Sequence, residues 1–112
     1  MDKDTVVLCG ASAYNKKYYL NKDFDRLPKN IKDELKAMCV LFTEEVGGVL
    51  TLCFEKDGTL LFETRCEDGD VLYDDIGSRL EIGRLRREKA ELFRGLTVFY
   101  KIFLLGEAEE CF

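Results

Sequence analysis

The sequence predicts an α+β domain with the order ββαββα, in which a four-stranded antiparallel sheet carries two helices packed on one face. Three observations lead to this prediction. Two apolar runs flank a Lys-Asp-Gly turn as in a β-hairpin, and two other stretches, one before and one after this hairpin, repeat their apolar residues with helical spacing. The first twenty residues are rich in β-branched and aromatic types. At 112 residues the chain has the length of one domain, so we assign residues 1–112 to a single domain.

The first two strands are predicted at residues 5–10 and 17–20. Val6 and Val7 give the first strand its β-branched character, and Tyr18 and Tyr19 give the second its aromatic character. A polar turn around Asn15 lies between them, so the two strands should form a hairpin.

The first helix is predicted to begin at Leu27-Pro28, because proline suits the first helical turn, where its missing N–H is not needed. Its apolar face is formed by residues spaced four, three, four and four apart, namely Ile31, Leu35, Met38, Phe42 and Val46. Gly47 should end the helix in the left-handed conformation.

The second hairpin has two competing registers. A two-residue loop would place charged side chains on the apolar face of the hairpin. A three-residue loop with Gly58 in the left-handed conformation pairs Phe54 with Leu60. The same register pairs Leu52 with Phe62, so the apolar side chains share one face. We therefore predict the three-residue loop.

An acidic connection follows at residues 67–75, within which residues 71–76 fit either a helical turn or a short strand. Ser78 is a candidate N-cap for the last helix, because Glu81 stands three residues later, as in a capping box. The apolar stripe of this helix is formed by Leu85, Leu92, Leu96, Phe99 and Phe103. The helix is predicted to run to about Leu105.

The side-chain inventory excludes several kinds of site. The chain has no histidine, so a Ser-His-Asp or Cys-His arrangement cannot form within it. The cysteines lack the paired spacing of zinc ligands, and they stand at 9, 39, 53, 66 and 111. An odd number of unpaired cysteines predicts free thiols in a reducing cytoplasm. We therefore predict no catalytic residue, no metal ligand and no cofactor. Two alternatives stay open: an activated thiolate at Cys53, if its sheet face is open, and a weak divalent-cation site at Asp70, Asp74 and Asp75.

Charge is distributed unevenly along the chain. The net charge is −5, which disfavours nucleic acid as a partner. Residues 79–94 nevertheless hold six cationic and three acidic side chains, a local balance of +3. The candidate anion-binding residues in this stretch are Arg84, Arg87, Lys89 and Arg94. The competing interpretation is a solvated helix whose arginines pair with nearby acids.

Beyond Gly95 the last helix is almost wholly apolar. A helix that is apolar on every side must be covered on every side, and in a chain this short a second copy can provide the cover. The candidate self-association residues are Val98, Phe99, Ile102, Phe103 and Leu105. The alternative is that the first helix and the N-terminal hairpin cover them. No apolar stretch is long enough to span a bilayer, so we expect no membrane partner.

Four stretches together resemble a family of small uncharacterised proteins from anaerobic Gram-positive bacteria, classed as a domain of unknown function. They lie at residues 6–11, 17–21, 34–52 and 87–93, so the resemblance covers nearly the whole chain. It carries no catalytic motif, and it implies only a bacterial, cytoplasmic setting.

The function predicted first is a non-enzymatic protein-interaction module. It is homodimeric through the C-terminal helix, and by analogy of composition it is comparable to small acidic chaperones that bind a further protein partner. The alternative is a regulatory domain that binds a small anionic ligand at the arginine-rich part of the last helix. A third hypothesis is an enzyme that uses carboxylates or a thiol without histidine.

Overall fold

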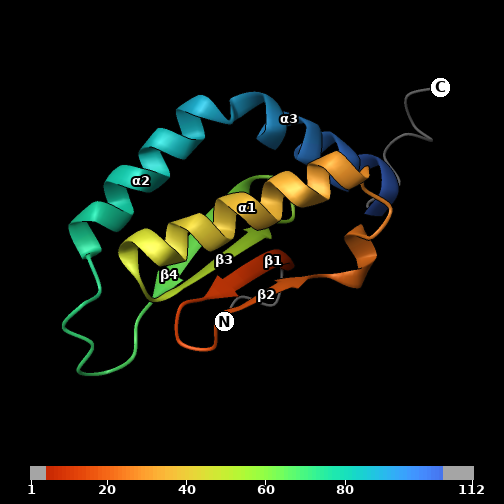
Figure 1. Cartoon of the computed structure of the whole chain (residues 1–112). Coiled ribbons are helices and arrows are strands. Elements are labelled where there is room, and N and C mark those ends of the chain that lie inside the picture. Colours follow the sequence, from red (N-terminus) through yellow and green to blue (C-terminus); the bar gives the residue numbers. More distant parts are fainter. Residues whose placement is uncertain (1–4, 105–112) are drawn as a thin grey trace.

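A computed structural model describes residues 5–104 of the chain (Figure 1). Within this range the protein is α+β, with a four-stranded antiparallel sheet and three α-helices. The elements in chain order are β1 (Val6–Ser12), β2 (Lys17–Leu20), the 3-10 turn η1 (Lys22–Phe24), α1 (Lys29–Val46), β3 (Val49–Phe54), β4 (Leu60–Arg65), α2 (Asp75–Glu88), α3 (Ala90–Phe99) and the π-helical segment η2 (Tyr100–Leu104).

Both predicted hairpins are confirmed, and they join through their first strands. The strand order is β2-β1-β3-β4, so β1 and β3 are central and β2 and β4 are the edges. The register between β1 and β3 shifts between Val7 and Cys9, which leaves Leu8 in a bulge. As a result Leu8 and Cys9 are consecutive residues that are both fully buried.

The three-residue loop of the second hairpin is also confirmed. Phe54 pairs with Leu60, and Leu52 pairs with Phe62. Gly58 has a φ of 94°, the left-handed value that the loop requires. The Glu55 N–H donates to the Thr59 carbonyl at 2.8 Å and closes the turn.

The α1 helix begins directly after Pro28 and ends at Gly47, as predicted. Gly47 has the expected positive φ of 84°, but its ψ of −171° is extended instead of left-handed helical. The reason is topological, because the chain must enter β3 two residues later. Gly48 also has a positive φ, of 71°, and its carbonyl accepts the Ala13 N–H at 2.9 Å.

The prediction of one last helix is wrong, because α2 ends at Glu88 and α3 starts at Ala90. Lys89 between them has φ −109° and ψ 22°, outside helical geometry. A straight helix from Ser78 to Leu104 would be about 40 Å long, at about 1.5 Å per residue. A six-residue strand such as β4 spans only about 20 Å. The bend lets both Leu85 and Leu96 reach the core.

The predicted N-cap is also wrong. Asp74 caps α2 by accepting the Gly77 N–H at 2.8 Å, and Ser78 lies buried inside the helix. Aspartate caps as well as serine does, and capping at Asp74 lets the helix start one turn earlier. Residues 71–74 before it contain no strand, so the helical alternative for the acidic connection holds only at its end.

The core lies between the sheet and the helices, all of which cover the same face of the sheet (Figure 1). Phe54 of β3 stacks between two rings, Phe24 at 5.8 Å and Tyr100 at 4.5 Å. Phe62 of β4 meets the edge of Phe93 of α3 at 5.2 Å. Each of these large side chains stabilises the fold by about 1.5–3 kcal/mol when fully buried.

Candidate functional site

The C-terminal apolar surface consists of Val98, Ile102 and Phe103, which are 49%, 36% and 51% exposed. Val98 and Ile102 are one helical turn apart, so they lie on one side of the segment. The Arg26 guanidinium lies over the Phe103 ring, with its central carbon 5.3 Å from the ring centroid. The structure thus leaves three of the five predicted self-association residues in water.

The other two predicted self-association residues behave differently. Phe99 is partly buried, with its ring 6.1 Å from that of Phe24 and 4.6 Å from that of Phe103. Phe99 therefore packs against the C-terminal apolar surface and contributes less exposed area to it than the other three residues do. Leu105 lies outside the described residues.

A second exposed apolar group was missed by the sequence analysis. The α2 apolar surface consists of side chains that are between 70% and 91% exposed, namely Val71, Leu72, Ile76 and Leu80. The signal was available, since Ile76 and Leu80 are four residues apart at the start of a helix. The acidic residues between these side chains hide the pattern in the sequence.

The candidate anion-binding residues do not converge on one point. Arg84 pairs with Glu81 and, at 2.6 Å, with Glu88, and the hydrogen bond from Arg84 holds the pKa of Glu81 below its usual value. Lys89 of the α2–α3 bend reaches Glu34 of α1 at 2.8 Å.

Arg94 pairs with Glu91 one turn before it. Arg87 makes no ion pair with any residue between 5 and 104, whereas Arg86 lies over the Phe62 ring at 4.7 Å. The competing interpretation, a solvated helix with local ion pairs, therefore describes most of this stretch.

Most of the cysteines between residues 5 and 104 are buried. Cys9, Cys39 and Cys53 are buried, and among the described cysteines Cys66 alone is exposed. Burial, followed by the charge of Glu63, raises the pKa of the Cys53 thiol to about 11. An activated thiolate needs the opposite shift, so the face of the sheet around Cys53 does not activate it.

The aspartates of the acidic connection are each engaged separately. Asp70 accepts a hydrogen bond from the Tyr14 hydroxyl, which lowers the pKa of Asp70. Asp74 caps α2, and Asp75 pairs with Arg79 at 3.1 Å. No group of three potential metal ligands occurs in the described part of the chain.

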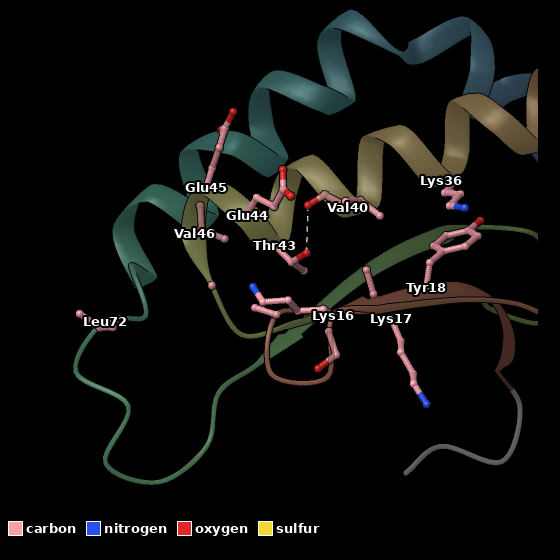
Figure 2. Close-up of a pocket in the computed structure, with 14 residues that line it drawn as sticks. Lys16, Lys17, Tyr18, Lys36, Val40, Thr43, Glu44, Glu45, Val46 and Leu72 are labelled. Atoms are coloured by element: carbon pink, nitrogen blue, oxygen red, sulfur yellow. Dashed lines mark hydrogen bonds between the residues drawn. The ribbon is translucent and has the colours of Figure 1, made fainter.

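A cavity of about 660 Å³ opens between α1 and the β1–β2 hairpin (Figure 2). Its walls include Ala11, Tyr18 and Val40, and lysines stand around it. The sequence analysis did not find it, because its two sides are 18 or more residues apart in the chain and only the packing of α1 over the hairpin joins them.

Comparison with known proteins gives one match. The model of a family described as "Family of unknown function (DUF6145)" matches residues 5–108. No curated protein and no solved structure matches the chain. Between residues 5 and 104, none of the helices combines the length and the apolar character needed to cross a membrane.

Proposed function

The chain belongs to this DUF6145 family of unknown function, and from that premise we propose that it is a non-enzymatic protein-interaction module that forms a homodimer in the bacterial cytoplasm. The observation that carries the proposal is the C-terminal apolar surface. Apolar side chains clustered in water favour association, because burial removes their surface from water. In the proposed dimer this surface contacts its own copy across a two-fold axis.

A second copy is the partner that fits this surface best. A two-fold contact needs a patch that is complementary to itself, and an uncharged aliphatic and aromatic patch meets that condition. Any charges on the preceding helix would then lie at the rim, where the ion pairs of Arg84 and Arg94 can stay in water.

The strength of the dimer can be bounded. Burying the exposed half of a Val, Ile or Phe side chain is worth about 1 kcal/mol, so the six side chains of two copies contribute roughly 6 kcal/mol. Association itself costs about 4–15 kcal/mol. After the association cost, the three residues of each copy leave at most about 2 kcal/mol, which corresponds to a dissociation constant of roughly tens of millimolar. The proposed dimer therefore needs further contacts around these residues.

Sedimentation velocity over a range of protein concentrations tests the proposal. The wild-type chain should shift from monomer to dimer as concentration rises, and Ile102→Glu should remain monomeric. Leu41→Glu is the matched control, since Leu41 is 55% exposed on α1, outside the C-terminal apolar surface. Circular dichroism confirms that each variant is folded. A folded Ile102→Glu variant that dimerises like the wild type would show that this is the wrong surface.

The chaperone-like version of the proposal draws its support from the α2 apolar surface. Aliphatic side chains with acidic neighbours form a surface that can bind apolar segments of another protein while the acids keep the complex soluble. Ile76→Asp should abolish such binding without changing dimerisation.

The alternative function, binding of a small anionic ligand at the last helix, has less support. Three of its four residues, Arg84, Lys89 and Arg94, already pair with carboxylates. A ligand would have to displace those partners. Phosphate-bearing metabolites at millimolar concentration would have to raise the melting temperature of the wild type but not that of Arg87→Gln. That result would support the anion-binding alternative.

A further inference from the structure

We propose that the cavity between α1 and the β1–β2 hairpin binds a linear aliphatic carboxylate, with the hydrocarbon chain inside the cavity and the carboxylate at Lys36. This site is independent of the C-terminal apolar surface. Its volume of about 660 Å³ lies within the range of small-molecule sites, about 300–1,000 Å³.

The interior of the cavity favours a hydrocarbon. Ala11, Val40 and the Tyr18 ring supply apolar surface from the strands and from α1 (Figure 2). Thr43 is the uncharged polar residue on the α1 side, and its hydroxyl donates a hydrogen bond to the carbonyl of Val40 at 3.0 Å. The Thr43 hydroxyl therefore offers no free donor to a ligand at this wall, and an aliphatic chain suits it better than a hydrogen-bond acceptor.

Leu72 gives a second argument for a hydrocarbon. Its side chain is 88% exposed, yet it is one of the residues that line the cavity. It belongs to the acidic connection, which Tyr14 holds against the hairpin by accepting the Glu67 N–H at 2.9 Å. Leu72 stands at the outer edge of the cavity with its side chain directed outward (Figure 2), so it adds apolar surface at the mouth.

The charges around the cavity favour an anion. In Figure 2 the side chains of Lys17 and Glu45 extend away from the cavity, whereas Lys16 reaches under Thr43 and Lys36 stands above Tyr18. Neither Lys16 nor Lys36 forms an ion pair within residues 5–104. Glu44 also lines the cavity, but lysines outnumber glutamates in the lining by three to two, so the charges favour a ligand with a negative end.

The position of the carboxylate follows from the helix. The C-terminal end of α1 at Val46 carries partial negative charge, which Lys16 beside it offsets. Lys36 lies nearer the middle of α1, away from that end, so it is the better partner for an anion. From Lys36 to Val46 the helix extends about 15 Å, at about 1.5 Å per residue. This length fits an extended chain better than a compact anion such as phosphate.

Titration of the 15N-labelled chain with sodium decanoate, followed by two-dimensional NMR, tests the assignment. Saturable shifts should concentrate on Ala11, Thr43 and Gly47. In Lys36→Gln the dissociation constant should rise about tenfold, as expected for loss of one charge-assisted contact. Lys29→Gln is the matched control: it lies on the same helix, pairs with Asp33 outside the cavity, and should bind like the wild type.

Two further measurements separate this site from general amphiphile binding. Val40→Trp should fill the cavity and remove the saturable shifts, and Lys36→Gln covers the case in which that variant fails to fold. Decyltrimethylammonium, with the same chain and the opposite charge, should bind at least tenfold more weakly than decanoate. Equal binding of the two amphiphiles, shifts confined to the C-terminal apolar surface, or no saturation at all would each overturn the proposal.

Discussion

Replacing Gly48 by alanine should destabilise the fold far more than the same change at Gly69. Both glycines have a positive φ, 71° and 82°, so both substitutions carry the left-handed penalty of about 1–2 kcal/mol for a residue with a Cβ. Reduced freedom of the unfolded chain returns about 0.4–1 kcal/mol in both cases. The conformational contribution is therefore the same at the two positions, about 1 kcal/mol.

The surroundings of the two glycines differ. A Cβ at Gly48 would lie 2.6 Å from the Arg65 carbonyl oxygen and 2.8 Å from the Tyr73 ring, whereas a Cβ at Gly69 meets nothing within 4 Å. The Arg65 carbonyl belongs to β4 and cannot retreat without disturbing its pairing with β3. Forced overpacking of this kind costs about 1–3 kcal/mol. We therefore expect Gly48→Ala to cost about 2–4 kcal/mol and Gly69→Ala about 1 kcal/mol.

Urea unfolding followed by circular dichroism measures the difference. With an m-value of about 1–3 kcal/mol/M, an extra 2 kcal/mol lowers the midpoint by roughly 0.7–2 M. If Gly48→Ala unfolds at the same urea concentration as Gly69→Ala, the close approach of the α1–β3 connection to Arg65 and Tyr73 is not a feature of the protein.

Two further predictions concern single contacts. Brief alkylation of the native protein, mapped by peptide mass spectrometry, should modify Cys66 rapidly and leave Cys53 unmodified, because Cys53 is buried and its pKa is raised to about 11; equal rates would contradict its burial. Tyr14→Phe should raise the pKa of Asp70 toward its usual value, since the Tyr14 hydroxyl holds it low. The Asp70 carboxylate stabilises the fold above its unfolded pKa, and that contribution is lost as the pH falls through the lower folded pKa. The stability gap between wild type and Tyr14→Phe should therefore narrow in acid, and an unchanged Asp70 pKa by NMR would refute the contact.

Elements with local sequence signals could be predicted without the structure. The register of β3 with β4 follows from which side chains must share the apolar face, and a slip of one residue would have exposed all of them. The limits of α1 follow from Pro28 and Gly47, whose backbone preferences act within a few residues. The absence of histidine removed whole classes of catalytic site without any structure.

Features that depend on contacts between segments far apart in the chain could not be predicted from the sequence. The bend at Lys89 arises because a straight helix would be longer than the sheet that it covers. The spacing of the apolar residues is helical on both sides of the bend, so the sequence pattern does not reveal it. Segments far away in the chain also determine whether an apolar side chain is covered. The Phe99 ring packs against the Phe24 ring, whereas Ile76 and Leu80 stay largely exposed. The cavity under α1 has the same origin, since Ala11 and Val40 line one cavity only after the helix has packed over the hairpin. Local sequence patterns indicate which secondary structure each segment prefers. The relative placement of the segments determines which surfaces remain available for binding.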